Sequence, residues 1–161
     1  AFSANDLLTL NDKNMRTKYL LPCLLAILAF VACDKMPENG DLDGQWQMTS
    51  IKHLNHDAPS ALNGKVYWSF QLKLLSIYTP DDLHNQGTNY TFCRFQVKGD
   101  SLHITKSYVH SMNTDIEMED GVAYLDVVGL HNNRESYAIQ TLTDSRMVLR
   151  SDYHELEFRK W

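Results

Sequence analysis

Large apolar residues occupy every second position between residues 66 and 74, and this alternation constrains the fold more than any other feature. The apolar set and the more polar set that alternates with it are Val66, Trp68, Phe70, Leu72 and Leu74, and Tyr67, Ser69, Gln71 and Lys73. Side chains along a β-strand point alternately to the two faces of its sheet. The segment therefore predicts one strand with an apolar inner face.

Similar patterns predict further strands, joined by short turns, along the chain after residue 43. The expected strands cover residues 45–53, 89–97, 101–106, 135–142, 146–150 and 154–160. Tight turns are expected at residues 98–100, 143–145 and 151–153. Consecutive antiparallel strands with one apolar face bury that face by closing or stacking. We therefore expect an all-β fold, an antiparallel up-and-down β-barrel of about 7–8 strands.

One segment, residues 116–129, departs from the strand pattern. It begins with acidic residues, and Val122, Leu125 and Val128 then follow at helical spacing, with Gly129 where a helix C-cap belongs. This predicts one short helix, although the β-branched residues leave a strand over 122–128 as the alternative. A single helical turn is also expected at residues 80–83.

The N-terminal part of the chain has a different character. Residues 19–32 contain no charge, follow a basic pair, and end at Cys33, which is followed at once by two charged residues. This arrangement is typical of a secretory signal, and the run is shorter than the about 20 residues of a membrane-spanning helix. The segment Phe30-Val31-Ala32-Cys33 resembles a bacterial lipobox, although Phe30 replaces the usual Leu, Val or Ile. The alternative is an apolar core helix in which Cys33 is a buried thiol.

These features divide the chain into four parts. We expect an upstream extension that is not native at 1–14, a lipoprotein signal peptide at 15–32, a polar flexible tether at 33–42, and the barrel domain at 43–161. Lipid on Cys33 would anchor the protein to a membrane of a bacterial cell envelope, and the outer membrane is the expected one.

Composition and motifs argue against several function classes. Acidic residues outnumber basic ones by 20 to 15, so we expect no nucleic-acid partner, which would need a basic face. Three cysteines are too few for a disulfide scaffold. Cys93 alternates with Phe95 and Val97, which indicates a small buried hydrophobe, with a catalytic thiol as the alternative. No nucleophile elbow, phosphate-binding glycine loop or HExxH motif occurs, so we expect neither enzymatic activity nor a cofactor.

Seven histidines invite a metal hypothesis, and they are dispersed along the sequence at His53, His56, His84, His103, His110, His131 and His154. The expected strands carry no His-x-His pair, and the sequence has no helix with histidines four residues apart. We interpret these histidines as solvated loop residues and expect no metal site.

The motif Gly44-Gln45-Trp46 opens the first expected strand, and Arg159 lies on the last one. A Gly-x-Trp motif at the first strand with an arginine on a late strand resembles the lipocalin, or calycin, pattern. In that pattern the tryptophan closes one barrel end and the arginine packs across it. The resemblance therefore implies that Gly44, Trp46 and Arg159 close the barrel, with Arg150 as the less favoured partner.

Later segments resemble small lipocalin-like lipoproteins of Bacteroidota. The similar segments are Gly129-Leu130 and residues 135–142, 147–151 and 156–158, so the resemblance covers roughly residues 43–161. It implies a lipocalin-like barrel and, since most such proteins have no assigned activity, it implies little about function.

Large inward residues of the expected strands are candidates for lining a ligand cavity: Met48, Trp68, Phe70, Leu72, Phe95, Ile104, Tyr137, Ile139, Met147, Leu149 and Phe158. An eight-stranded barrel is just wide enough for side chains to fill it, or it holds one small ligand. We expect binding of a small apolar or amphipathic ligand without catalysis. The alternative is a filled barrel that serves as an envelope module for a protein or glycan partner, through loops or through outward aromatic residues such as Tyr90.

Overall fold

The computed structural model describes residues 38–55, 65–80, 89–110, 114–120 and 123–161, which belong to the compact unit Pro37–Trp161. The expected signal peptide, the expected lipidation site at Cys33 and most of the expected helical turn at 80–83 lie outside these residues. In the part of the chain that is described, no helix has the length and apolar character needed to cross a bilayer.

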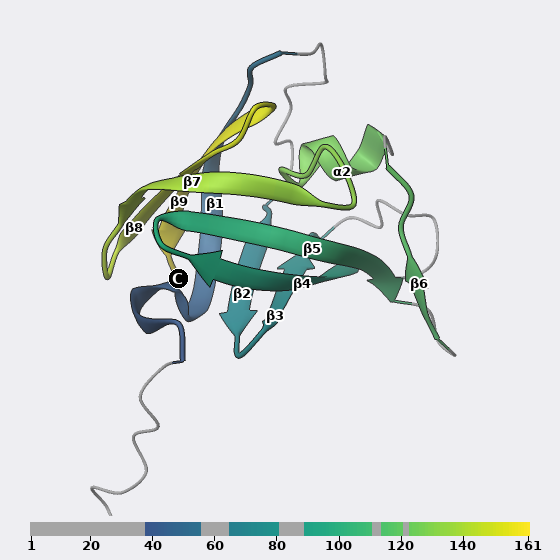
Figure 1. Ribbon diagram of the computed structural model, residues 1–161, viewed down its shortest axis with the longest axis horizontal. Helices are drawn as coiled ribbons and strands as arrows, with labels where there is room; N and C mark the ends of the chain where they lie inside the picture. The colour runs from purple at the N-terminus through teal and green to yellow at the C-terminus, as the bar shows by residue number, and fades with distance from the viewer. Residues whose placement is uncertain (1–37, 56–64, 81–88, 111–113, 121–122) are drawn as a thin grey trace, which may run out of the picture. The chain divides into compact units, whose positions relative to one another are not determined.

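The described elements follow one another as a β-meander with a short helical insertion. They are η1 (Gly40–Leu42), β1 (Gly44–His53), β2 (Tyr67–Gln71), β3 (Leu74–Tyr78), β4 (Tyr90–Lys98), β5 (Ser101–His110), β6 (Asp115–Glu117), α2 (Ala123–Val127), β7 (Glu135–Leu142), β8 (Arg146–Arg150) and β9 (His154–Lys160). Within the described residues, eight antiparallel strands close into a barrel through the β1–β9 and β4–β5 pairings (Figure 1). The short strand β6 pairs antiparallel with the end of β5. The expected all-β barrel is confirmed.

The alternation between residues 66 and 74 does not form a single strand. The chain reverses at Leu72 and Lys73, and Gln71 pairs with Leu74 across this two-residue turn. Leu72 has φ +55° and its side chain is 61% exposed. The expected inward position of Leu72 is therefore wrong. This turn was not predicted because its residues include none of the Gly, Asn or Asp residues that favour a positive φ.

The segment 116–129 contains two elements rather than one helix. β6 pairs with β5, and helical structure is confined to α2. The N–H of Leu130 donates to the Leu125 carbonyl at 2.9 Å, and Gly129 has φ +91°, so the helix ends where the sequence predicted a glycine cap. The expected short helix is confirmed over residues 123–127, and a strand over 122–128 is contradicted there.

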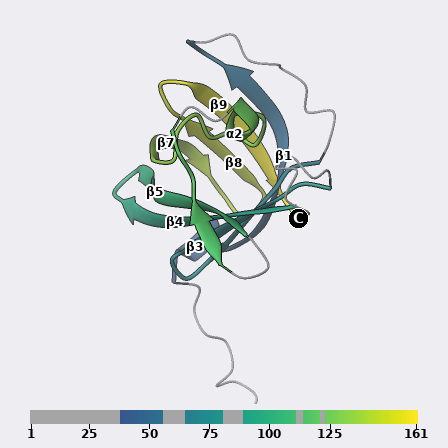
Figure 2. The same ribbon diagram turned by 90° about the vertical axis from the view of Figure 1, so that its right-hand side faces the viewer.

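The barrel interior is filled by aromatic and aliphatic side chains. The indole of Trp68 lies among three other rings, with centroid separations of 5.1 Å to Phe158, 6.0 Å to Tyr137 and 6.1 Å to Phe70. Aromatic rings at such separations bury large apolar areas and add favourable edge contacts. The strands curve around this core, and α2 lies near β1, β7 and β9 at one end (Figure 2).

Candidate binding site at the mouth of the barrel

Trp46 closes the end of the barrel at which β1 begins. Its side chain is 0% exposed, and its Nε1–H donates to the Leu42 carbonyl of η1 at 2.8 Å. Gly44 has φ +109°, and a Cβ there would lie 3.2 Å from Cε of Lys160. The glycine of the Gly-x-Trp motif therefore leaves room for a lysine side chain to pass over the indole.

The basic side chain over Trp46 belongs to Lys160. Its Nζ lies 4.2 Å from the centroid of the Trp46 ring, and it donates to the carbonyl oxygens of Asp41 at 2.7 Å and Asp43 at 2.5 Å. Partial burial lowers the pKa of Lys160 below its ordinary value, against the opposing influence of nearby carboxylates. Lys160 therefore combines a cation–π contact with two hydrogen bonds that fasten η1 to the barrel.

Arg159, which the resemblance implied as the partner of Trp46, lies on the outer face of β9. Its guanidinium donates to Oε1 of Gln47 at 2.9 and 2.6 Å and lies 5.5 Å from the ring centroid of Trp161. Arg150, the second candidate, forms a surface ion pair with Glu155. Successive residues of a strand point to opposite faces, so the implied assignment to Arg159 is wrong by one residue.

Most side chains expected to line a cavity are packed against one another. All but two are at most 4% exposed: Met48, Trp68, Phe70, Phe95, Ile104, Tyr137, Met147, Leu149 and Phe158. Ile139 is partly buried at the edge of this core, and Leu72 lies outside it. The described side chains thus occupy the interior in which a ligand was expected.

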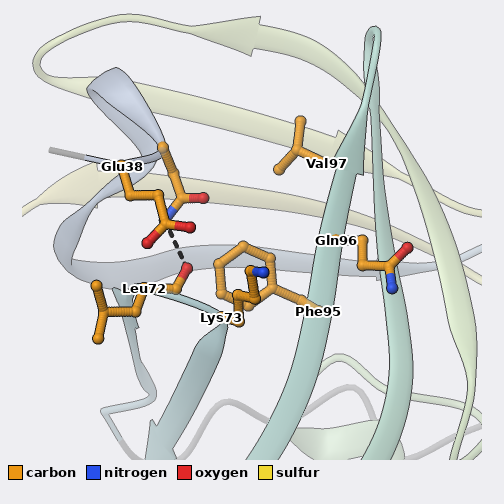
Figure 3. A pocket seen from close by; sticks show the side chains of 7 residues that line it. Glu38, Leu72, Lys73, Phe95, Gln96 and Val97 are labelled. Carbon is orange, nitrogen blue, oxygen red and sulfur yellow. Dashed lines mark hydrogen bonds between the residues drawn. The ribbon is translucent and has the colours of Figure 1, made fainter.

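A surface depression of about 550 Å³ lies near the Trp46 end (Figure 3). It is lined by Glu38, Asn39, Leu72, Lys73, Phe95, Gln96 and Val97. The side-chain amide of Asn39 donates to the Leu72 carbonyl at 2.8 Å across it. This hydrogen bond fixes the β2–β3 turn against the segment before η1, which gives the depression a structural explanation.

The opposite end of the barrel, which we call the mouth, is marked by His53 and His154. These two residues pair across β1 and β9, seven positions along β1 from the pair formed by Trp46 and Lys160. At about 3.4 Å per residue the two pairs are separated by roughly 24 Å of chain along β1. The imidazole centroids of His53 and His154 are 5.2 Å apart.

The helix α2 and the residues after it cover the mouth and are tied to the core by two hydrogen bonds. The indole Nε1–H of Trp68 donates to the Val128 carbonyl at 3.0 Å, and the phenol of Tyr137 donates to the Gly129 carbonyl. Burial raises the pKa of the Tyr137 phenol well above its ordinary value. Trp68 and Tyr137 therefore hold the cover in place as well as filling the core.

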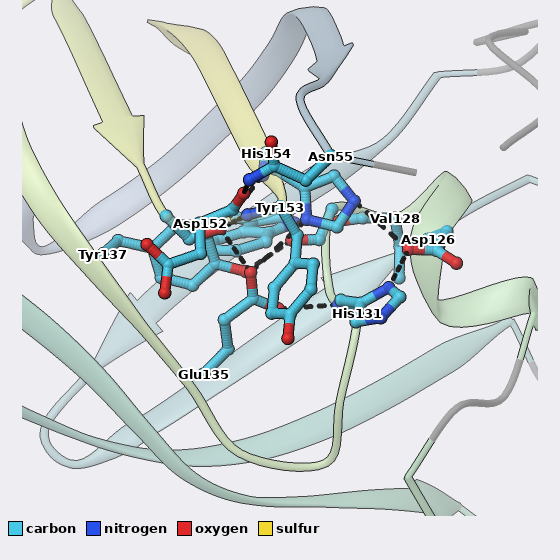
Figure 4. Close-up of polar contacts among 12 residues, drawn as sticks. Asn55, Asp126, Val128, His131, Glu135, Tyr137, Asp152, Tyr153 and His154 are labelled. Carbon is cyan, nitrogen blue, oxygen red and sulfur yellow. Dashed lines mark hydrogen bonds and ion pairs between the residues drawn. The ribbon is translucent and has the colours of Figure 1, made fainter. Parts of the chain in front are cut away.

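His154 lies between two carboxylates beneath this cover. Its side chain is 0% exposed, its Nδ1 lies 3.4 Å from Oε1 of Glu135, and its Nε2 lies 3.3 Å from Oδ1 of Asp126 (Figure 4). Nδ1 of His131 lies 3.0 Å from the same Asp126 oxygen. The mouth therefore brings imidazole rings and carboxylate groups together where His154 and Glu135 are almost fully buried, and polar interactions are strong in such surroundings.

Glu135 is held by further contacts. Its Oε1 accepts a hydrogen bond from the Ser151 hydroxyl at 2.5 Å, and its Oε2 accepts one from the His131 backbone N–H at 2.6 Å. The His131 ring stacks on Tyr153 with centroids 3.9 Å apart and an interplanar angle of 21°. The network thus connects α2, the start of β7 and the β8–β9 turn (Figure 4).

A depression of about 290 Å³ opens beside this network. Its lining residues come from β5, the start of β7 and the β8–β9 turn: Ile104, Arg134, Glu135, Ser136, Ser151, Asp152 and Tyr153. Glu135 and Ser151 belong both to the depression and to the buried network. A molecule bound in this depression would therefore contact groups that are already ordered.

The interpretation of the histidines as solvated loop residues is wrong for His154. His53, Asp126 and His154 each present a possible metal-ligand atom, and these atoms lie within 4.8 Å of one another. The sequence did carry one indication of this burial. His154 alternates with Leu156 and Phe158, so its side chain points to the same inner face of the strand. The pairing with His53 depends on closure of the barrel between strands about 100 residues apart, which a local pattern does not reveal.

Cys93 is a free, buried thiol on β4. Burial raises the pKa of Cys93 from 9.0 to about 12, despite a hydrogen bond with Ser107 that acts in the opposite direction. The thiol therefore stays protonated at neutral pH, whereas a nucleophilic cysteine requires the thiolate. The structure supports the buried-hydrophobe interpretation of Cys93.

Residues 27–161 match a family model described as a lipocalin-like domain, which covers more than half of the chain. The chain belongs to the lipocalin-like domain family. The resemblance inferred from the Gly-x-Trp motif and the late strands is thereby confirmed, although the basic residue at the barrel end is Lys160.

This lipocalin-like chain is similar to two solved structures from Bacteroides species. A lipocalin-like protein from Bacteroides uniformis aligns with 76% of this chain and 100% of its own, with a TM-score of 0.54 and 20% identity. An uncharacterized protein from Bacteroides eggerthii aligns with 74% of this chain and 99% of its own, with a TM-score of 0.50 and 16% identity. At these identities the similarity supports the fold. A search among curated proteins gives no match.

Proposed function

We propose that this lipocalin-like protein binds a small amphipathic ligand at the mouth of its barrel, without catalysis, while a lipid on Cys33 anchors it in a bacterial envelope membrane. The depression beside Glu135, Ser151 and Tyr153 carries the binding proposal, because it joins the surface to ordered polar groups at the mouth. Small-molecule sites combine an apolar surface with a few well-placed polar groups.

The packing of the core argues for the mouth rather than the interior. Trp68 and Tyr137 are both 0% exposed and are hydrogen-bonded to the chain that follows α2. A ligand deep in the barrel would displace these rings and break those bonds, and close-packed interiors resist such insertion. A ligand at the mouth requires neither change.

The lining of the depression indicates the chemistry of the ligand. Ile104 supplies a buried apolar contact, Arg134 supplies guanidinium donors, and Glu135 and Asp152 supply carboxylate acceptors. A purely apolar molecule would displace water from the exposed Arg134 and Asp152 side chains without replacing the lost hydrogen bonds, which is costly. An apolar fragment of a few carbon atoms with a polar head satisfies both kinds of surface.

Native mass spectrometry of the full chain, extracted in mild detergent, tests the binding proposal. We expect a bound small molecule in the wild type and its loss in Ser136→Trp, whose indole would fill the depression. Ala138→Trp is the matched control, because Ala138 is exposed on the same face of β7 but does not line the depression. Retention of the ligand by Ser136→Trp, or its absence from the wild type, would contradict the proposal.

The anchor proposal is supported by the apolar run at 19–32 and by the lipobox-like residues before Cys33. Expression of the full chain in a bacterial host should give a membrane-bound product with a diacylglyceryl mass on its N-terminal cysteine. Cys33→Ala should fractionate as an unlipidated soluble protein. Unchanged membrane fractionation of Cys33→Ala would refute the anchor.

A second candidate function, glycan binding, is favoured by a row of aromatic residues on the outer face. Tyr67, Tyr78 and Tyr90 pair across β2, β3 and β4, with ring centroids 6.1 and 5.0 Å apart. Trp161 extends the row at 5.4 Å from Tyr67 and is 62% exposed, and Tyr90 is 43% exposed. Tyr67 is only 8% exposed and meets the Trp161 ring edge-on at 78°, so the exposed rings of Tyr90 and Trp161 are the surfaces available for stacking on a sugar.

A glycan array probed with the full chain distinguishes this candidate from the first. Binding through the aromatic row predicts that Tyr90→Ala loses the array signal while Ser136→Trp keeps it. Ile116→Ala serves as the control, because Ile116 is 52% exposed on β6, away from the row. An array signal that survives Tyr90→Ala would exclude the row as the binding surface.

A further inference from the structure

We propose that His53, Asp126 and His154 bind a divalent zinc ion at the mouth of the barrel. The inference goes beyond ligand binding in the neighbouring depression and does not depend on it, since the three residues do not line that depression. Two imidazole nitrogens and one carboxylate oxygen form a donor set that suits zinc.

The positions of the ligand atoms fit a single ion. Atoms bound to one tetrahedral zinc lie roughly 3.3–3.5 Å apart, because Zn–N and Zn–O distances are about 2.0–2.1 Å. Nε2 of His154 and Oδ1 of Asp126 are already 3.3 Å apart, and the ligand atoms of all three residues lie within 4.8 Å of one another. His53 ends β1 and is half-buried, and an ideal tetrahedral site would require its ring nitrogen to move closer to the other two ligand atoms.

The contacts of the His154 ring are those expected of a zinc-bound histidine. Nδ1 of His154 faces Oε1 of Glu135 at 3.4 Å, which directs Nε2 toward Asp126 and the proposed ion. Metal-ligating histidines commonly donate their other ring N–H to a carboxylate, which fixes the ring and raises its basicity. Glu135 is itself held by the hydroxyl of Ser151, so it acts as a positioning residue.

The carboxylates at the mouth also support a cation site. The Asp126 and Glu135 side chains are buried in the part of the chain that the structure describes, and both lie beside the His154 ring. Buried polar groups are stabilised by hydrogen bonds, by opposite charges or by metal coordination. The Asp126 carboxylate would bind a zinc ion directly, and Glu135 would face the ion across the His154 ring. Three protein ligands would leave one tetrahedral position for another ligand.

The His131 side chain supports the carboxylate of the proposed site. Its Nδ1 lies 3.0 Å from Oδ1 of Asp126, and its ring is fixed by stacking on Tyr153. Asp126 therefore reaches the site from α2 with its orientation restricted, while both histidine ligands come from paired strands. Such rigid supports reduce the entropy lost when a metal binds.

Isothermal titration calorimetry of the chelator-treated full chain with zinc alone tests the proposal. We expect one zinc ion per chain, bound with a dissociation constant below about 1 μM, which corresponds to −8.2 kcal/mol. Substitution of a ligand, as in His53→Ala or Asp126→Asn, should weaken binding at least about 100-fold, and Glu135→Gln about 10- to 100-fold. His103→Ala is the matched control, because His103 lies on β5 and contacts Ser136 outside the cluster.

Cobalt absorption provides a second readout that a purely structural role would not change. The cobalt-loaded wild type should show visible bands of a tetrahedral site without a thiolate charge-transfer band, and His53→Ala should lose them. Circular dichroism of each metal-free variant checks folding. Because His53 is only half-buried, His53→Ala still tests the proposal if Asp126→Asn fails to fold. Absence of stoichiometric zinc binding, or equal binding by His53→Ala and wild type, would overturn the proposal in favour of a buried ion-pair network.

Discussion

The ammonium group of Lys160 lies 4.2 Å from the ring centroid of Trp46 and donates to two backbone carbonyls beside η1. One side chain thus covers the indole that closes the barrel and ties down the segment that precedes it. The contact depends on Gly44, where a side chain would press on the lysine stem. The Gly-x-Trp motif and the penultimate residue of the chain therefore form one structural unit.

Replacement of Lys160 by methionine should lower the free energy of unfolding by about 1–2 kcal/mol, because it removes a cation–π contact and two hydrogen bonds while keeping an apolar stem. Arg159→Met is the matched control and should change stability by at most about 0.5 kcal/mol, since Arg159 is exposed. Urea denaturation followed by tryptophan fluorescence measures both. A larger effect of Arg159→Met would reverse the assignment of the barrel-end cation.

Removal of the Trp46 side chain should destabilise the fold by about 3–5 kcal/mol, because a fully buried indole leaves a large cavity. Trp161→Ala should cost less than about 0.5 kcal/mol, since Trp161 is 62% exposed. The two substitutions remove the same side chain, so thermal and urea unfolding compare burial directly. Similar losses in both variants would mean that Trp46 does not plug the barrel.

Gly129→Ala should destabilise the protein by about 2–4 kcal/mol, because two penalties combine. Gly129 has φ +91°, and a Cβ there would lie 2.9 Å from Cδ1 of Leu156 and 3.1 Å from Cε of Met48. Gly99→Ala is the control, because Gly99 has φ +57° with open space around it and should cost only about 1 kcal/mol. Equal costs measured by calorimetry would show that the cover residues repack freely.

Stability should fall above pH 9 because of Cys93. The unfolded thiol ionises near its ordinary pKa of 9.0, whereas burial raises the pKa in the folded protein to about 12. The folded state binds more protons over this window, so the contribution of Cys93 to stability falls by about 1.4 kcal/mol for each pH unit. The difference in unfolding free energy between wild type and Cys93→Ala should therefore shrink as pH rises from 9 to 11. A difference that is independent of pH would contradict the burial of this thiol.

Local patterns in the sequence predicted most strands, the late turns and the short helix. The expected strand at 135–142 coincides with β7, and those at 146–150 and 154–160 coincide with β8 and β9. These elements were readable because side-chain alternation and turn composition act between neighbours along the chain. The β2–β3 turn was missed because Leu72 adopts a positive φ that its residue type does not indicate.

The candidate site was harder to predict because its residues are distant in the sequence. His53 and His154 meet only when β1 and β9 pair, and Asp126 joins them from α2. The alternating pattern placed His154 among inward residues, but it did not identify the polar groups that stabilise a buried imidazole. Those groups, Asp126 and Glu135, lie on other elements. The lipocalin resemblance likewise implied Arg159 as the cation that packs over Trp46, whereas the register of β9 places Lys160 there.

The sequence by itself determined that this protein forms an antiparallel barrel with a tryptophan at its first strand, because period-two apolar patterning and turn residues are local properties. Only the tertiary structure decided which cation covers that tryptophan and which polar groups gather at the mouth. Those outcomes depend on strand register and on closure between β1 and β9. A shift of one residue in a strand exchanges its two faces, and nothing in the isolated segment specifies its partner.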